Sequence, residues 1–252
     1  QTALMFVYYL ITRWKELGKI NGKEYIVKTI VTTETIKTIA ERNGVEMYDV
    51  YTGFKWIANV MRENEGKKNY IGGGEESYGF LCEDFVRDKD AVSACVILAE
   101  IAAWAKDQGL SLYQLLQKIY VEYGFSKEKG ISVVKKGKSG AEEIEAMMKK
   151  FRENPLTEIA GSKVTYFYDY STLKGKDYAE NETVTLDMPT TSNVLQYFTE
   201  DNTKVSIRPS GTEPKIKFYM EVQGEMGCRN CFASADAAAM EKIEAVKKSL
   251  GI

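Results

Sequence analysis

The chain has 252 residues, 44% of them apolar, and this length suits two ordinary domains with their own cores. Its 34 basic and 36 acidic side chains nearly cancel, so we expect no nucleic-acid partner and no attachment to an anionic membrane. Because no run approaches the roughly 18 apolar residues of a membrane span and the start lacks a signal peptide, we expect a cytoplasmic protein.

The first half of the chain alternates predicted helices and strands. In chain order these are a helix at 3–17, a strand at 23–31, a helix at 32–44, a strand at 45–51, a helix at 54–64 and a strand at 69–73. This order predicts a largely parallel sheet with helices on both faces, whose ligands gather at the carboxyl ends of the strands. Thr52, Gly53 and the loop Gly72–Ser77 follow strands, so we expect them at that edge.

Two longer helices are predicted next, at 91–108 and 112–124. Asp90 can cap the first, and Ser111 with Gln114 has the spacing of a capping box for the second. We expect both helices to cover the sheet. The chain begins at Gln1 inside an apolar helical pattern rather than at a methionine, so we expect it to be a piece of a larger protein.

The pattern changes after about residue 125. Ser139 and Glu142 have the spacing of a capping box that opens a helix at 141–154. The remaining predicted elements are strands at 163–171 and 183–189, a short helix at 193–198, strands at 204–211 and 214–224, and a helix at 235–250. Runs of strands flanked by helices predict an α+β domain with an antiparallel sheet. We therefore divide the chain into an α/β domain at 1–138 and an α+β domain at 139–252.

A candidate phosphate-binding loop lies in the stretch SIRPSGTEPKIKFY. Arg208 offers a planar fork of donors that matches a phosphate, Ser210 and Thr212 offer hydroxyls, and Gly211 allows backbone N–H groups to turn toward one anion. Lys215 follows closely, and a proline at each end stiffens the loop. The alternative is a tight hairpin turn with two surface charges. No Walker pattern is present, which argues against ATP binding.

A second candidate loop is GGGEESYG. Glu75 and Ser77, if they point the same way, could bind the hydroxyls of a sugar, with Glu76 facing elsewhere in a structural role. The alternative is a solvated acidic loop. Lys89, taken alone, is typical of a surface salt bridge.

Cys228 and Cys231 form a CxxC. The pair could be a redox pair, half of a metal site, or an incidental pair in a loop. No second CxxC completes a set of four ligands, no βαβ pattern surrounds it, and the absence of histidine excludes conventional zinc sites and triads that contain it.

With both loops considered together, the chain resembles the α-D-phosphohexomutase superfamily, the phosphoglucomutases and phosphomannomutases. GGEESYG resembles that family's sugar-binding loop and RPSGTEPK its phosphate-binding loop, and the latter is highly specific. TGFKWI, RDKDAV, and FRENP followed by EIAGSKV also resemble family segments, in the family's order. Members have four domains, and this chain resembles the third and fourth. The resemblance implies a mixed α/β domain followed by a smaller α+β domain of the TATA-binding-protein-like type.

The resemblance also implies roles for individual residues. Glu75 and Ser77 would bind sugar hydroxyls, and Lys89 would stand near the reacting phosphate as the catalytic candidate in this chain. Thr52 and Gly53 would line the sugar site. The phosphate that is not transferred would be bound by Arg208, Ser210, Gly211 and Thr212, with Lys215 nearby.

Family members carry a catalytic phosphoserine in a Thr-Ala-Ser-His-Asn-Pro-like loop and bind magnesium through an Asp-x-Asp-x-Asp loop. Neither motif occurs here, so we expect no metal ligands in this chain. The resemblance implies a parent enzyme, a phosphotransferase-type isomerase, that interconverts sugar 1-phosphates and 6-phosphates. It would use the phosphoserine, magnesium and a bisphosphorylated intermediate, with glucose 1,6-bisphosphate as activator.

We expect the chain to bind a hexose or pentose phosphate, to work with the missing amino-terminal domains of the same protein, and to be inactive alone. One alternative is a non-catalytic sugar-phosphate-binding module. Another is a phosphate-dependent interaction protein without sugar chemistry.

Overall fold

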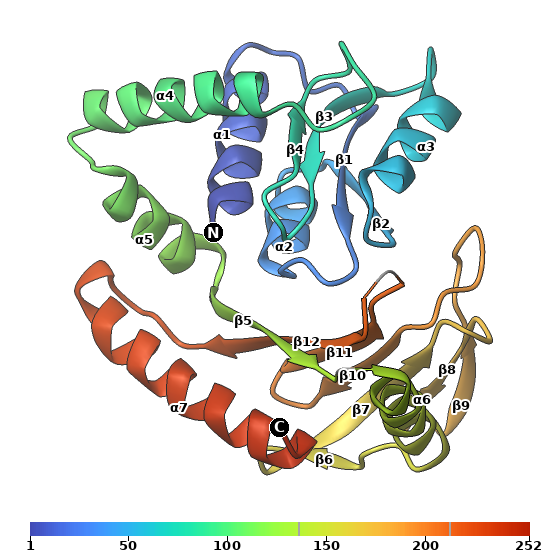
Figure 1. Ribbon diagram of the computed structural model, residues 1–252. Helices are drawn as coiled ribbons and strands as arrows, with labels where there is room; N and C mark the ends of the chain where they lie inside the picture. The colour runs from blue at the N-terminus through green and yellow to red at the C-terminus, as the bar shows by residue number, and fades with distance from the viewer. Residues whose placement is uncertain (136, 212) are drawn as a thin grey trace. The chain divides into compact units, whose positions relative to one another are not determined.

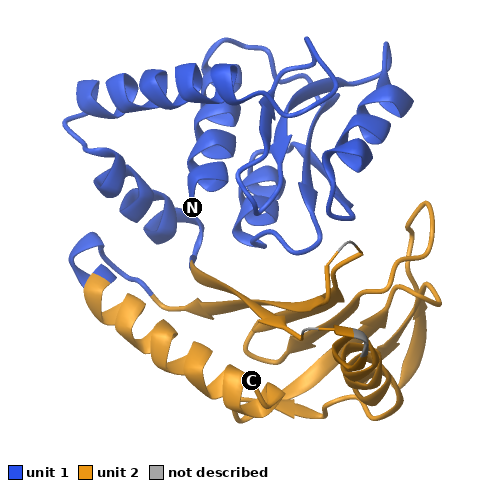
Figure 2. Ribbon diagram, viewed as in Figure 1, with its two compact units in different colours: residues 1–125, 226–232 blue, residues 126–225, 233–252 orange. Residues whose placement is uncertain are grey.

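The computed structural model describes residues 1–135, 137–211 and 213–252 (Figure 1). The chain forms two compact units, shown in separate colours in Figure 2. The first contains residues 1–125 and 226–232, and the second contains 126–225 and 233–252. The chain therefore passes from one unit to the other after residues 125, 225 and 232. The proposed domain division at residue 138 stays a prediction.

The first unit is built on a four-stranded sheet in the order β2-β1-β3-β4. The strands are β1 (Glu24–Thr29), β2 (Glu46–Val50), β3 (Asn69–Gly74) and β4 (Phe80–Cys82). β1 lies between β2 and β3 and is parallel to both, whereas the short β4 is antiparallel to β3 at the edge. All six residues of β1 are buried, as expected for the central strand of a sheet covered on both faces.

The first unit also contains five helices, whose arrangement is drawn in Figure 1. They are α1 (Thr2–Glu16), α2 (Thr35–Arg42), α3 (Phe54–Asn64), α4 (Ala91–Asp107) and α5 (Leu112–Tyr123). The apolar side of α3 packs with β1, β3 and β4 in one core cluster that includes Tyr25, Val27, Ile57 and Leu81. The β-α-β-α-β order predicted from the sequence is confirmed.

The caps predicted for α4 and α5 are also confirmed. The Asp90 carboxylate accepts hydrogen bonds from the N–H groups of Val92 and Ser93. Ser111 and Gln114 exchange the two side-chain to backbone bonds of a capping box. These bonds satisfy N–H groups that the first turn of a helix leaves without partners, so both helix starts are fixed locally by sequence.

The second unit contains an eight-stranded sheet in the order β5-β12-β11-β10-β7-β8-β9, with β6 paired beside β7. The strands are β5 (Phe125–Val134), β6 (Glu158–Ile159), β7 (Ser162–Asp169), β8 (Lys174–Asp177), β9 (Glu182–Thr185), β10 (Leu195–Thr199), β11 (Lys204–Pro209) and β12 (Lys215–Gly224). The pairings from β12 through β11, β10, β7 and β8 to β9 are antiparallel. The expected α/β fold followed by an α+β fold is confirmed.

The helices of this part of the chain are α6 (Gly137–Glu153) and α7 (Phe232–Leu250), the latter preceded by a 3₁₀ turn at Arg229–Cys231. On β11, Val205 and Ile207 are fully buried, and on β12 so is Phe218. The ring of Phe151 in α6 meets Phe218 edge-on at 6.2 Å. α6 therefore packs against the apolar face of the strands that carry the candidate phosphate loop.

Two local predictions in this half were wrong. Residues 193–198 were expected to form a short helix, but Leu195–Thr199 is strand β10, at the centre of the sheet. Four of its five residues are buried, the polar Gln196 included, so the segment lacks the alternation of buried apolar and exposed polar residues that distinguishes a strand from a helix. Ser139 was expected to cap a helix at 141, but α6 already begins at Gly137, so Ser139 lies inside it. In the part of the chain that the structure describes, no helix is both long and apolar enough to cross a membrane.

Candidate functional site

The loop Glu75–Gly79 connects β3 to the antiparallel β4. The N–H of Glu75 donates to the carbonyl of Gly79 at 2.7 Å and closes the loop on itself. Tyr78, at its tip, has a φ of 69° and is fully exposed. A Cβ at Gly79 would lie 2.8 Å from Glu75 Oε2 and 2.9 Å from Lys89 Cδ. Only glycine allows those two side chains to approach the loop backbone so closely.

Glu75 is the centre of this loop's contacts. Its Oε1 accepts a hydrogen bond from the N–H of Gly53 at 2.8 Å, and Lys89 Nζ lies 4.0 Å from its Oε2. Gly53 has a φ of 114°, in the region that favours glycine, and this conformation turns its N–H toward the carboxylate. The carboxylate is thus held by one backbone donor and faces one cation.

Lys89 occupies a defined position despite its exposure. Its Nζ lies 5.8 Å from the centre of the Phe54 ring and 3.6 Å from Asp88 Oδ1. The structure therefore brings Gly53, Glu75 and Lys89 together, with Thr52 next to Gly53 in the chain. Ser77 is exposed in the same loop.

Glu76 points to a different partner from Glu75. Its Oε2 accepts from Thr29 Oγ1 at 3.1 Å, and the Thr29 hydroxyl also shares a hydrogen bond of 2.8 Å with Thr32. Thr29 is the buried last residue of β1, so the second carboxylate of the loop is tied to the end of the central strand. This supports the structural role expected for Glu76. The sequence reasoning missed Thr29, whose only signal was its place at the end of a strand.

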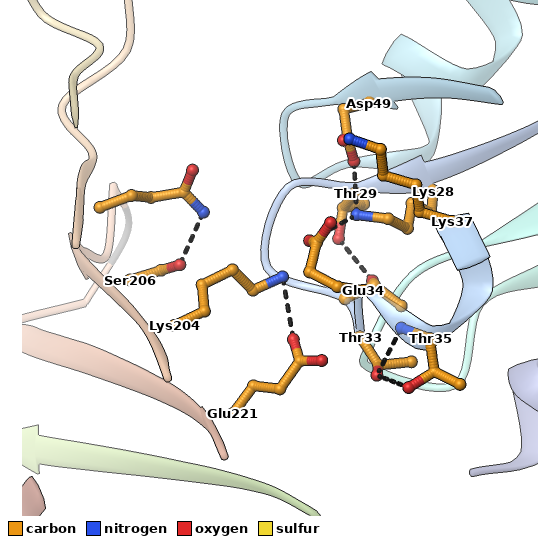
Figure 3. A network of polar contacts seen from close by, with 12 residues as sticks. Lys28, Thr29, Thr33, Glu34, Thr35, Lys37, Asp49, Lys204, Ser206 and Glu221 are labelled. Carbon is orange, nitrogen blue, oxygen red and sulfur yellow. Dashed lines mark hydrogen bonds and ion pairs between the residues drawn. The ribbon is translucent and has the colours of Figure 1, made fainter. Parts of the chain in front are cut away.

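Lys28, next to Thr29, is a buried cation with two acidic partners (Figure 3). Its side chain is 1% exposed, and its Nζ lies 2.6 Å from Asp49 Oδ1 and 3.0 Å from Glu34 Oε1. Burying a lysine is costly unless the charge is paired, and these two carboxylates pair it. The ion pairs join β1 to β2 and to the start of α2, at the strand end where Thr29 contacts the loop Glu75–Gly79.

The candidate phosphate-binding loop joins β11 to β12. The N–H of Ser210 donates to the carbonyl of Lys215 at 2.8 Å, and the N–H of Lys215 donates to the carbonyl of Glu213 at 2.7 Å. The N–H of Lys135, just after β5, donates to the carbonyl of Pro214 at 2.9 Å. Arg208 lies opposite Lys217 in the strand register. The loop is thus a closed turn that begins and ends on cation-bearing strands.

The side chains of Arg208, Ser210 and Lys215 are half-buried, whereas Glu213 is exposed. Lys215 makes an ion pair with Glu213, and this contact lowers the pKa of the Glu213 carboxyl. A Cβ added at Gly211 would meet nothing within 4 Å. Thr212 lies outside the described residues. Beside the loop is a cavity of about 590 Å³, lined by residues of α6 together with Ser210, Gly211, Glu213 and Lys215.

Strand β11 carries two buried polar side chains, Lys204 and Ser206, on the positions that alternate toward Arg208. Lys204, Ser206 and Arg208 alternate along the strand and so share one face. Lys204 Nζ lies 3.1 Å from Glu221 Oε2 on β12, and both side chains are 3% exposed (Figure 3). Sequence reasoning missed this pair. Its signal was the alternation of polar 204, 206 and 208 with apolar 205 and 207.

The sequence-predicted residues thus fall into two groups. Thr52, Gly53, Glu75, Ser77 and Lys89 belong to the first unit, whereas the residues of the phosphate-binding loop belong to the second. Among residues 1–135, 137–211 and 213–252, no group of three or more Cys, Asp or Glu side chains is arranged to hold a metal ion.

Residues 2–123 match the family of phosphoglucomutase/phosphomannomutase alpha/beta/alpha domain III, and residues 132–238 match the phosphoglucomutase/phosphomannomutase C-terminal domain. A phosphoglucomutase of Staphylococcus haemolyticus (strain JCSC1435) is 35% identical over 220 residues, which cover 87% of this chain and 39% of that protein. One of Staphylococcus aureus (strain bovine RF122 / ET3-1) is 39% identical over 198 residues, 79% of this chain and 36% of that protein. The chain therefore spans less than two fifths of the length of these relatives.

Solved structures show the same fold. The open form of pp63/parafusin, a phosphoglucomutase from Paramecium, matches 100% of this chain and 42% of its own, with a TM-score of 0.59 and 16% identity. A phosphoglucomutase/phosphomannomutase family protein from Burkholderia thailandensis matches 99% of this chain and 42% of its own, with a TM-score of 0.56 and 15% identity. At these identities the likeness concerns the fold alone.

Proposed function

Since this chain belongs to the phosphoglucomutase/phosphomannomutase family, within the α-D-phosphohexomutase superfamily, and corresponds to its carboxyl-terminal half, we propose that it is that half of a sugar-phosphate mutase. The parent enzyme would be an isomerase that interconverts sugar 1-phosphates and sugar 6-phosphates. Its substrate would be a hexose or pentose phosphate. The chain would supply binding and orientation for that substrate.

The observation that carries this proposal is the arrangement around Glu75. An ionised carboxylate accepts hydrogen bonds and donates none, and the vicinal hydroxyls of a sugar are donors. Gly53 holds Oε1 of this carboxylate by its N–H, and Lys89 faces Oε2. The group is therefore oriented before a ligand arrives, which reduces the entropy lost on binding. Ser77 and Thr52 would complete the sugar site.

The phosphate-binding loop would hold the phosphate that is not being transferred. Arg208 and Lys215 would supply charge, and Ser210, Gly211 and Thr212 would supply hydroxyl and N–H donors. Such a loop would bind a phosphate group through charge and hydrogen-bond donors and would make no contact that depends on the sugar attached to it. That property suits a mutase, because the phosphates of both ends of the sugar must occupy the same place in turn.

Phosphoryl transfer also needs a nucleophile and charge neutralisation at the reacting phosphate. In this proposal the phosphoserine and magnesium belong to amino-terminal domains outside this chain, and the described residues do not form a set of magnesium ligands. The metal would neutralise charge on the phosphate, and glucose 1,6-bisphosphate would act as activator. Lys89 would stand near the reacting phosphate. The chain alone would be inactive, and turnover of glucose 1-phosphate by the purified chain would contradict this.

Calorimetric titration of the chain with glucose 1-phosphate and with inorganic phosphate tests the binding roles. Arg208→Ala is expected to weaken binding of both ligands by about 1.5–3 kcal/mol, the cost of losing a charge-assisted hydrogen bond. Lys174→Ala removes one positive charge at an exposed position of strand β8 and is the matched control, with unchanged affinity expected. Equal affinities of wild type and Arg208→Ala would identify the loop as an ordinary hairpin turn.

The same titration with Glu75→Gln tests the sugar site separately. The amide loses one acceptor and faces Lys89 without a negative charge, so affinity for glucose 1-phosphate is expected to fall about tenfold. Affinity for inorganic phosphate is expected to stay the same. A loss that is equal for both ligands would show that Glu75 supports the fold rather than the sugar.

A further inference from the structure

The proposed function leaves the CxxC motif unused. Cys228 and Cys231 form a disulfide, with Cα atoms 5.3 Å apart. Cys228 is exposed and Cys231 is half-buried. The other two cysteines are free thiols: Cys95 is exposed on α4, whereas Cys82 is buried, and burial raises the pKa of its thiol to about 12. Because the thiolate is the reactive form, Cys82 is inert at neutral pH, and the accessible redox chemistry lies at the CxxC and at Cys95.

The disulfide spans the turn that begins α7. The 3₁₀ turn Arg229–Cys231 lies inside the ring that the disulfide closes, and Phe232 follows at once as the first residue of the helix. The ring is small, so it restricts only a few residues of the unfolded chain and stabilises the whole fold much less than a bridge between distant residues would. Its effect is local: it fixes the direction in which Phe232 leaves the turn.

Phe232 is the anchor of this turn. Its ring packs edge-on against Tyr113 at 5.3 Å and against Phe125 at 6.0 Å, and it stacks on Tyr120 at 6.3 Å. Tyr113 and Tyr120 belong to α5. Contacts of this kind between aromatic rings are favourable beyond the area that they bury. The disulfide and the aromatic cluster therefore act on the same short segment, one through the backbone and the other through the side chain.

This segment has an unusual place in the chain. Residues 226–232 belong to the first unit, although the chain on either side of them, 126–225 and 233–252, belongs to the second (Figure 2). The disulfide lies wholly within this segment. Its oxidation state is thus placed to control how firmly the segment is held in the first unit.

We propose that Cys228 and Cys231 are a thiol–disulfide exchange site, reduced by a dithiol, and that reduction releases segment 226–232 from the aromatic cluster. A thiolate of the dithiol attacks the exposed Cys228 Sγ, the Cys228–Cys231 bond breaks, and Cys231 leaves as a thiolate that takes up a proton. The second thiol of the reductant, as its thiolate, then attacks the mixed disulfide and releases Cys228, which is protonated in turn. Two electrons and two protons pass to the protein, and the reductant becomes a cyclic disulfide. This regulation is independent of the proposed sugar-phosphate function.

The test compares oxidised and reduced forms of the full chain carrying Cys95→Ser, with dithiothreitol as the dithiol and no sugar phosphate present. Mass spectrometry after thiol alkylation is expected to find Cys228 and Cys231 protected before reduction and alkylated after it. Hydrogen exchange of 226–232 and of α5 is expected to become about tenfold faster on reduction, while β1 stays protected. Alkylation of both cysteines in the untreated protein, or equal exchange rates in the two forms, would overturn the proposal.

Two variants separate the chemistry from the packing. Cys228→Ser combined with Cys231→Ser is expected to show the fast exchange of the reduced form with or without dithiothreitol, and protection of β1 shows that the variant is folded. Phe232→Leu keeps the disulfide but removes the ring, so α5 is expected to exchange fast in both redox states. If α5 still slows on oxidation in Phe232→Leu, the aromatic anchor does not transmit the change and that part of the proposal is wrong.

Discussion

The two candidate loops are built in opposite ways. In the loop after β3, both carboxylates are anchored by the surrounding fold, Glu75 by the N–H of Gly53 and Glu76 by the hydroxyl of Thr29. In the loop after β11, the backbone is closed by its own hydrogen bonds, Gly211 has open space around it, and Lys215 forms an ion pair with Glu213 of the same turn. The first loop is held by side-chain hydrogen bonds to other segments of its unit. The second is closed by backbone hydrogen bonds between residues of the turn itself.

Glycine substitutions give the largest expected difference between these loops. A Cβ at Gly73, just before the sugar loop, would lie 2.2 Å from the carbonyl oxygen of Val27 and 2.8 Å from the hydroxyl of Tyr70. Gly73→Ala is therefore expected to lower the free energy of unfolding by about 3 kcal/mol, since the neighbouring backbone of β1 must move. Gly211→Ala is expected to change it by less than about 0.5 kcal/mol.

Urea unfolding of the two alanine variants measures this difference, with circular dichroism as the signal. Each variant is compared with the wild type under the same conditions. A similar loss of stability in both variants would mean that Gly211 is as closely packed as Gly73. That result would contradict the difference between the two regions described above.

Thr29→Val tests the anchor of the sugar loop with a smaller expected effect. The substitution keeps the shape of a buried side chain but removes the hydroxyl that donates to Glu76, and a loss of about 1.5 kcal/mol in unfolding free energy is expected. Thr29→Ser retains the hydroxyl and serves as the control. Equal stability of Thr29→Val and wild type would show that Glu76 does not depend on this bond.

Glu213→Gln tests whether the ion pair between Glu213 and Lys215 limits phosphate binding at the candidate phosphate-binding loop. Its expected effect, on the affinity for inorganic phosphate, is the smallest of those predicted here. Removing the carboxylate frees Lys215 from its ion pair and removes a negative charge near the ligand, so affinity for inorganic phosphate at pH 7 is expected to rise about threefold. Because Lys215 lowers the pKa of Glu213, the carboxylate stays charged at pH values within its ordinary titration range and loses its charge only as the pH falls through the lowered pKa.

The advantage of the variant should therefore persist at pH 5 and shrink at lower pH. Glu182→Gln, on exposed strand β9, is the matched control for loss of one negative charge. Unchanged phosphate affinity in Glu213→Gln would show that Lys215 does not take part in binding.

The sequence predicted those elements whose signals are local. The caps at Asp90 and Ser111 and the helix 54–64 depend on neighbouring residues, and the structure contains them as expected. β10 depends on its place at the centre of a sheet, where burial on both faces removes the alternation of a half-buried strand. The short β4 and β8 hold their strand conformation through pairing with longer neighbours, and no local pattern indicates them.

The site divides in the same way. Glu75 was found from a motif, and the approach of Gly53 to it was expected from the rule that strand ends meet at one edge of a parallel sheet. Thr29 and the pair Lys204–Glu221 were missed, because their partners are distant in sequence and arrive only through folding. The roles of the ten predicted site residues stay predictions until ligand binding is measured.

The return of segment 226–232 to the first unit has a consequence for the order of synthesis. A ribosome makes the chain from its amino end, so these residues emerge only after 126–225 have been made. Domains generally fold as units while synthesis proceeds. The sheet of the first unit lies wholly within residues 24–82. The ring contacts that Phe232 makes with Tyr113, Tyr120 and Phe125, however, can form only after Phe232 has been synthesised. The first unit is therefore complete only after residue 232 has been made, although most of its residues precede those of the second unit in the chain.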